Sequence, residues 1–223
     1  MSTWLGIDAA TPVGGVAVVR HGVLLAEVTL GLTTRHSALL LPATDFALRA
    51  AGIERRLLDG IVVGEGPGSF TGVRIAAATA RGLAAALDVP LYAVSSLAAA
   101  AAASGVRERA VCALFDARRG EVYAACYRFG ADAPEVLLEP VAAPLAEVLA
   151  QVATHSPEFT GEGAVRYAGQ LPRAPLPALL SPPRAAALVW LHEQAPERGR
   201  VQEIAGWEPS YLRTSGAERG LNA

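Results

Sequence analysis

The sequence predicts an α/β protein with mixed sheets, built from both antiparallel and parallel strands. Three observations lead to this prediction. Short apolar runs near the start are joined by tight turns, which favours an antiparallel meander. Further along, apolar runs alternate with segments of helical spacing, which favours parallel strands joined by helices. After Ser104 the order starts again in a shorter form, so we expect two related halves, residues 1–104 and 105–223.

The first half is expected to contain five strands and three helices. His21-Gly22 separates two apolar runs, and a two-residue loop with glycine in second place suits a hairpin turn. The helical patterns stop at Gly52 and before Pro90, because glycine and proline end helices. The expected strands are Trp4–Asp8, Gly15–Arg20, Val23–Leu30, Leu58–Val63 and Leu91–Val94, and the expected helices are His36–Ala51, Thr71–Leu87 and Ser96–Ala103.

The second half is expected to repeat this order in reduced form. A strand at Ala110–Phe115 ends at Asp116, just as the first strand of the chain ends at Asp8. Residues 156–183 are rich in proline and glycine, and no element is assigned to them. The remaining expected elements are the strands Glu121–Phe129 and Glu135–Leu138 and the helices Pro144–Ala153 and Pro183–Glu193.

Composition limits what this chain can do. The 223 residues are 52% hydrophobic and 18% charged, which is enough for a sizeable core. The net charge is −2 and there is no basic run, so autonomous binding to nucleic acid or to an anionic membrane is not expected. All 19 basic residues are arginine, which excludes a Schiff-base lysine and a P-loop lysine. With no signal peptide and no membrane-spanning stretch in view, we expect a cytoplasmic protein.

The cysteines and histidines do not form a metal-binding pattern. Cys112 and Cys126 fall in two strands of one expected hairpin. In a cytoplasmic protein two small buried side chains are the favoured interpretation, with a disulfide as the alternative. The four histidines are scattered along the chain and never lie four residues apart, so we expect no zinc site.

A glycine-rich loop runs from Gly64 to Gly72, between an expected strand and an expected helix. Such a loop either presents N–H groups to an anion or lets two backbones approach closely. It does not match a P-loop, which needs a lysine, and it has Ser69 where a dinucleotide fingerprint has its third glycine. It also lacks the G-x-S-x-G of a nucleophile elbow, so we interpret Ser69 as a helix cap rather than a nucleophile.

The helix after this loop is made almost wholly of small residues. Gly72, Ala76, Ala80 and Ala84 repeat every four residues along one ridge, and Arg74 and Arg81 share another face. Because the helix is small or apolar nearly all round, it is expected to be buried on both sides. It is either a central helix of one large domain or a helix at a protein–protein interface. We favour the interface, with the helix His36–Ala51 beside it.

The turn after the first strand has a second candidate function. Gly6–Thr11 resembles the phosphate-binding hairpin of actin-like ATPases and sugar kinases, in which Asp8 and Thr11 would hold nucleotide and metal. Ala10, however, stands where that hairpin has a glycine, so we favour Asp8 as a strand-end cap. A further alternative pairs Asp8 with Asp116 in a nuclease site, although such sites usually contain more acidic residues and a basic groove.

The segment Gly66–Ile75 resembles the signature of the TsaB (YeaZ) family. Supporting similarities are Ile7-Asp8 with Thr11, His36-Ser37 with Leu40 and Pro42, Pro90 to Leu97, Asp116–Tyr123, and Tyr211-Leu212-Arg213. The resemblance follows the chain in order over nearly its whole length and is loosest between residues 129 and 209. It implies an actin-like (ASKHA, RNase-H-like) fold of two related βββαβα-type halves with mixed sheets and flanking helices.

The resemblance also implies a function. Members of this family are non-catalytic scaffold or activator subunits that help to add the threonylcarbamoyl group to the adenosine beside the anticodon of tRNA. The implied partners are the paralogue TsaD, bound through the helical face, and the ATPase TsaE, with homodimers formed by the isolated chain. ATP and metal would belong to these partners, and tRNA would be contacted only indirectly. The alternative is an active actin-like kinase or ATPase that uses Asp8 and Thr11.

From the helical face we derive a set of expected partner-binding residues. They lie in the glycine loop and the two helices that flank it, and they are His36, Leu39, Leu40, Gly68, Ser69, Phe70, Thr71, Gly72, Arg74, Ala76, Ala80, Arg81 and Ala84.

Overall fold

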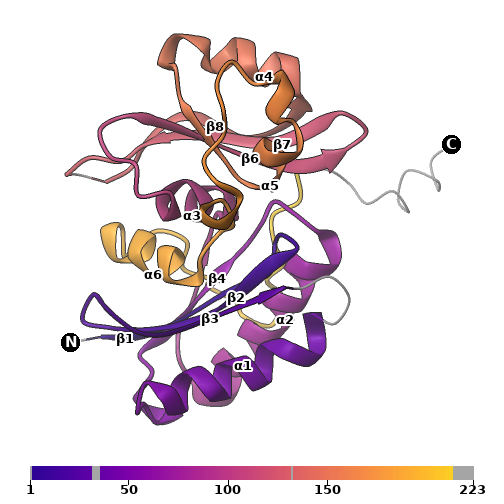
Figure 1. Ribbon diagram of the computed structural model, residues 1–223. Helices are drawn as coiled ribbons and strands as arrows, with labels where there is room; N and C mark the ends of the chain where they lie inside the picture. Colours follow the sequence, from indigo (N-terminus) through magenta and orange to yellow (C-terminus); the bar gives the residue numbers. More distant parts are fainter. Residues whose placement is uncertain (1, 32–35, 132, 213–223) are drawn as a thin grey trace, which may run out of the picture.

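The computed structural model describes residues 2–31, 36–131 and 133–212, and two mixed sheets form its frame (Figure 1). The first sheet has five strands in the order β3-β2-β1-β4-β5. Strands β1, β2 and β3 pair antiparallel, whereas β4 and β5 join β1 in parallel. The strands are β1 (Thr3–Asp8), β2 (Val13–Arg20), β3 (Val23–Gly31), β4 (Gly60–Gly64) and β5 (Leu91–Val94).

The second sheet repeats the first with one strand fewer. Its order is β8-β7-β6-β9, with β6, β7 and β8 antiparallel and β9 parallel to β6. Strand β6 therefore takes the place of β1, and β9 takes that of β4. The strands are β6 (Ala110–Arg118), β7 (Glu121–Arg128), β8 (Glu135–Pro144) and β9 (Glu158–Thr160).

Helices and sheets alternate in layers (Figure 1). Helices α1 and α2 lie on the outer side of the first sheet, α3 and α6 lie between the two sheets, and α4 covers the far side of the second sheet, where α5 also packs. No helix among the described residues is long and apolar enough to cross a membrane. The helices are α1 (His36–Ala50), α2 (Phe70–Leu87), α3 (Ser96–Ala103), α4 (Leu145–Val152), α5 (Glu162–Arg166) and α6 (Ala185–Gln194).

The central strands of both sheets are buried on both faces, and successive residues of such a strand supply different core layers. In β6, Val111 and Ala113 face α3 and α6, whereas Cys112 and Leu114 face α4 and α5. Leu5 likewise packs toward α1 and α2. This follows from the period of two in a strand. The apolar runs of β1, β2 and β4 are therefore central strands covered on each side, whereas β3 is an edge strand whose Val23, Leu24 and Leu25 are exposed.

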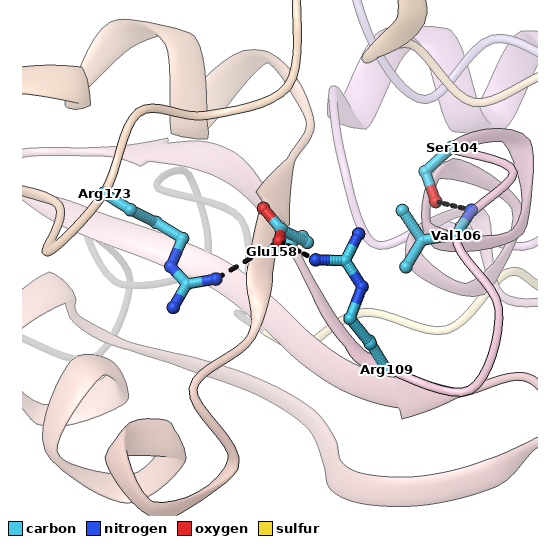
Figure 2. A network of polar contacts seen from close by, with 5 residues as sticks. All are labelled: Ser104, Val106, Arg109, Glu158 and Arg173. Carbon is cyan, nitrogen blue, oxygen red and sulfur yellow. Dashed lines mark hydrogen bonds and ion pairs between the residues drawn. The ribbon is translucent and has the colours of Figure 1, made fainter.

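The connection between the two sheets is held by polar contacts (Figure 2). At the end of α3, the Ser104 hydroxyl accepts a hydrogen bond of 3.2 Å from the backbone N–H of Val106. Glu158 of β9 forms ion pairs with Arg109, at 2.6 Å, and with Arg173, at 3.2 Å. These contacts tie the start of the second half to its edge strand β9.

The second half returns to the first at the end of the chain. Helix α6 packs against β1, β2 and β4 of the first sheet, and residues 199–201 run along β5. The N–H of Ala93 donates to the Gly199 carbonyl at 2.7 Å, and the N–H of Val201 donates to the Leu91 carbonyl at 2.9 Å. The segment 199–212 therefore covers the β5 edge of the first sheet and extends to α2.

The expected elements match the observed ones closely, with a few differences. Strand β8 continues to Pro144 instead of ending at Leu138, because its later residues still pair with β7. Residues 156–183, to which no element was assigned, contain the short strand β9 and helix α5. Cys112 and Cys126 face each other across β6 and β7 as free, buried thiols, which is the favoured interpretation.

Candidate functional site

The loop between β4 and α2 lies at the centre of the candidate site. Ser69 caps α2, because its hydroxyl accepts a hydrogen bond of 3.3 Å from the backbone N–H of Gly72. The N–H of Ser69 donates to the Ala10 carbonyl at 2.7 Å, and the N–H of Gly66 donates to the Ser96 hydroxyl at 3.3 Å. These N–H groups are thus engaged within the chain rather than directed at a bound anion.

The loop glycines allow a close approach of two backbone segments. A Cβ on Gly68 would lie 2.2 Å from the Ala10 carbonyl oxygen, and one on Gly72 would lie 2.0 Å from the Ala9 carbonyl oxygen. Any side chain at either position would force the loop away from the β1–β2 turn. Of the two uses that the sequence allows for this loop, the geometry favours close backbone packing.

Asp8 is completely buried beneath this turn. One carboxylate oxygen accepts a hydrogen bond of 2.8 Å from the N–H of Ala10, and the other accepts one of 2.6 Å from the Ser96 hydroxyl. Burial disfavours the charged form and raises the pKa of Asp8 to about 6, against the opposing effect of these two hydrogen bonds. A Cβ on Gly64 would lie 1.9 Å from an Asp8 carboxylate oxygen, so a residue larger than glycine at position 64 would clash with Asp8.

The alternative nucleotide site is not supported by this geometry. Thr11 is buried, and its hydroxyl donates to the Val13 carbonyl at 2.5 Å within the same turn. Asp8 and Thr11 therefore stabilise the turn that follows β1, and both oxygens of Asp8 are already bonded. The interpretation of Asp8 as a strand-end cap fits the observed contacts.

Asp116 is likewise bound within its own half of the molecule. It accepts a hydrogen bond of 2.9 Å from the Tyr167 hydroxyl and lies 3.4 Å from the Arg166 guanidinium. Its own N–H donates to Glu162 at 3.0 Å. Among the described residues, neither a direct bond nor a shared partner links Asp116 to Asp8, and no group of three or more His, Cys, Asp or Glu could hold a metal ion. The paired-carboxylate interpretation is not supported.

Four of the expected partner-binding residues, and Gly72, belong to the core instead. Leu40, Ala76, Ala80 and Ala84 are at most 1% exposed and pack between the two helices and the first sheet. The ridge that includes Gly72 was expected to meet a partner, but it faces the chain's own sheet. The physical reason is that small side chains let α2 lie close to β1 and β4. Assigning these five residues to partner binding is therefore wrong.

Other members of the predicted set do lie at the surface. Leu39, Ser69, Phe70, Thr71 and Arg74 are exposed, whereas Gly68 and Arg81 are half-buried. His36 begins α1, but its side chain lies outside the described part of the chain.

The exposed sides of α1 and α2 form a surface that we call the α1/α2 face. Its large apolar side chains are Leu39, Leu41, Phe46 and Phe70, with exposed fractions of 36%, 51%, 60% and 44%. The exposed positions of α2 are otherwise small or polar, and Arg74 is the charged residue among them (all of α2 is described). Exposed apolar side chains on adjacent helices are typical of interaction surfaces.

Three residues of this face were missed in the sequence. Leu41 and Phe46 had no separate signal, because an apolar residue on an amphipathic helix is normally assigned to the core. Ala78 lies on the exposed side of α2, two positions from the ridge that was chosen. A different choice of ridge would have found it, but the periodicity alone allows both.

Arg81 is already used within the chain. Its guanidinium donates a hydrogen bond to the carbonyl of Ala205, in the segment that follows α6. Val201, Ile204 and Trp207 of the same segment pack against the core that α2 covers. Arg81 therefore anchors the C-terminal segment to α2, whereas Arg74 is the exposed cation of α2.

Comparison with known proteins relates the chain to a tRNA-modification family. A family model described as TsaD, tRNA N6-adenosine threonylcarbamoyltransferase, matches residues 25–174. The Bacillus subtilis tRNA threonylcarbamoyladenosine biosynthesis protein TsaB is 39% identical over 127 residues, which are 57% of this chain and 56% of that protein. The Escherichia coli protein of the same name is 37% identical over 126 residues, 56% of this chain and 54% of the relative. These matches span about half the length of each relative.

Two solved structures match over nearly the full chain. YeaZ from Pseudomonas aeruginosa has a TM-score of 0.81 at 34% identity, covering 95% of this chain and 100% of that one. A P. aeruginosa protein described as similar to the peptidase YEAZ has a TM-score of 0.82 at 35% identity, covering 96% and 100%. The predicted fold class, an actin-like (ASKHA, RNase-H-like) fold, is confirmed.

Proposed function

The chain belongs to the TsaB (YeaZ) family, and from this premise we propose that it is a non-catalytic subunit in tRNA threonylcarbamoyladenosine biosynthesis. In this proposal it supports the addition of the threonylcarbamoyl group to the adenosine beside the anticodon, and a partner performs the transfer. ATP and metal belong to the partner subunits. The net charge of −2 supports an indirect contact with tRNA in the cytoplasm.

The proposed partner is TsaD, which docks on the α1/α2 face, and the ATPase TsaE joins the resulting pair. The observation that carries the proposal is the exposure of Leu39, Leu41, Phe46 and Phe70 on adjacent helices. Covering this face would remove a large apolar area from water, which is the main driving force of most protein association. The same face could also pair two copies of this chain when TsaD is absent.

The test of function is reconstitution. The matching TsaD and TsaE, ATP, threonylcarbamoyl-adenylate and tRNA are combined with and without this chain, and modified adenosine is quantified. We expect modification to fall strongly when the chain is left out. Equal modification in both reactions would refute the proposal.

The test of the docking face uses two matched arginine substitutions. Ala78→Arg places a long cation on the exposed side of α2 and should abolish co-elution with TsaD while the circular dichroism spectrum stays unchanged. Leu179→Arg adds the same charge at a leucine that is 89% exposed in the second half, and it should leave co-elution intact. Undiminished co-elution of the Ala78→Arg variant would exclude this face as the contact.

A further inference from the structure

One end of the α1/α2 face carries a cluster of three side chains. Phe70 is the first residue of α2, and Arg74 follows one turn later with its guanidinium carbon 5.0 Å from the centre of the Phe70 ring. The Tyr211 ring lies 5.4 Å from the same ring, centre to centre. Phe70 and Tyr211 are 44% and 40% exposed, so the cluster opens to solvent. The chain thus assembles one surface feature from α2 and from its C-terminal segment.

Arg74 differs from half of the sixteen described arginines, which form ion pairs within the chain. Arg49, Arg128 and Arg184, for example, form ion pairs with carboxylates of the same chain. Within the described residues, the recorded ion pairs do not include Arg74. Its guanidinium lies over the Phe70 ring, and the residue is exposed, so its five N–H donors are available to an acceptor of a partner.

We propose that the Phe70–Arg74–Tyr211 cluster receives an aspartate or glutamate side chain of the protein that docks on the α1/α2 face. This inference rests on the proposed function and adds the chemistry by which the partner is selected. A guanidinium binds a carboxylate through two parallel hydrogen bonds, and stacking on Phe70 already restricts its orientation. Arginine and aromatic side chains are enriched in the energetically dominant part of interfaces.

The cluster also discriminates against other occupants. A protein that covers Arg74 without offering a carboxylate would bury an unpaired cation, which is strongly unfavourable. In a symmetric pair of copies the same surface contributes to both sides, so the cation-bearing face of one copy meets the cation-bearing face of the other. The carboxylate of α1, Asp45, is already paired with Arg49 and Arg55. A different protein with an acidic residue therefore matches the face better than a second copy.

The test measures the affinity of TsaD for variants of this chain by isothermal titration calorimetry. Arg74→Gln should weaken binding by roughly tenfold or more, Arg74→Glu should weaken it further, and Arg74→Lys should lose less than Arg74→Gln. Tyr211→Ala should weaken binding because it removes the ring that packs against Phe70. Arg20→Gln, which removes an exposed arginine at the end of β2, is the matched control and should bind like the wild type.

The outcomes separate this inference from the proposed function. If the wild type binds TsaD and both Arg74→Gln and Arg74→Glu bind within twofold of it, the carboxylate contact is wrong although the docking partnership stands. If the wild type does not bind TsaD at all, the partnership is wrong and this inference is overturned with it. Recovery of binding between Arg74→Glu and a TsaD variant with one acidic residue changed to arginine would identify the carboxylate.

Discussion

The buried carboxyl of Asp8 should make the stability of the fold depend on pH. Its pKa is raised from 3.8 to about 6 in the folded chain, because desolvation outweighs its two hydrogen bonds. The folded state therefore binds this proton more tightly than the unfolded state. The resulting stabilisation is fully present below pH 3.8 and is lost as the pH rises through 6. At about 1.4 kcal/mol for each tenfold change in proton affinity, the loss amounts to about 3 kcal/mol.

Asp8→Asn removes this titration while keeping the shape of the side chain. The asparagine oxygen can still accept from the N–H of Ala10, and the amide nitrogen can donate to the Ser96 hydroxyl. Relative to the wild type, the free energy of unfolding of the variant should therefore rise by about 2.4 kcal/mol between pH 4 and pH 7.

Urea unfolding of both proteins at half-unit steps from pH 4 to pH 7.5 measures this difference. Asp88→Asn, which changes an exposed carboxyl at the end of α2, is the control for the loss of one acidic group. Parallel curves for the wild type and Asp8→Asn would refute the reasoning. A pH-dependent difference of equal size in both variants would also refute it, because the effect would then not come from burial.

Three further predictions concern the loop, α2 and the C-terminal segment. Gly72→Ala should lower the free energy of unfolding by about 2 kcal/mol or more, because its Cβ would lie 2.0 Å from the Ala9 carbonyl oxygen. Gly82→Ala, which has open space around its Cβ, should instead raise the free energy of unfolding by about 1 kcal/mol. Equal thermal unfolding midpoints for the two variants would contradict the packing argument. Ser69→Ala should cost about 1 kcal/mol through loss of the helix cap, and an unchanged urea midpoint would show that the cap contributes nothing. Arg81→Ala should speed amide hydrogen exchange at Ala93 and Val201, because it removes the hydrogen bond to Ala205 in the segment that covers β5. Unchanged protection of these two amides would mean that Arg81 does not anchor the segment.

Most elements of this fold could be predicted from local patterns. The hairpin turn at His21-Gly22 has both residues at positive φ, 53° and 72°, as a two-residue loop requires. The helix cap at Ser69 is also predictable from sequence, because the capping hydroxyl and the N–H that it accepts from, that of Gly72, lie within four residues of one another. The sequence does not predict the short elements β9 and α5 within residues 156–183, because they are too short for a hydrophobic periodicity to be recognised.

The exposed side of α2 was harder to predict than the helix itself. The ridge with Ala80 and the ridge with Ala78 both consist mostly of small residues, so periodicity does not distinguish the inner one from the outer one. The sheet makes the choice, because Gly72 has to lie against the Ala9 carbonyl. The contribution of Tyr211 depends on a contact between distant parts of the chain, and no local pattern reports such a contact.

Residues 199–212 pack against the first half of the chain, which is synthesised first. Strand β5 gains its outer neighbour from Gly199 and Val201, and Phe70 gains its second ring contact from Tyr211. During synthesis, therefore, α1 and α2 leave the ribosome long before the docking face is complete. The contact between Phe70 and Tyr211 exists only after residue 211 has been added and folded back. In the proposed docking, chains that stop before residue 211 would present this surface without the Tyr211 ring and would bind the partner less tightly.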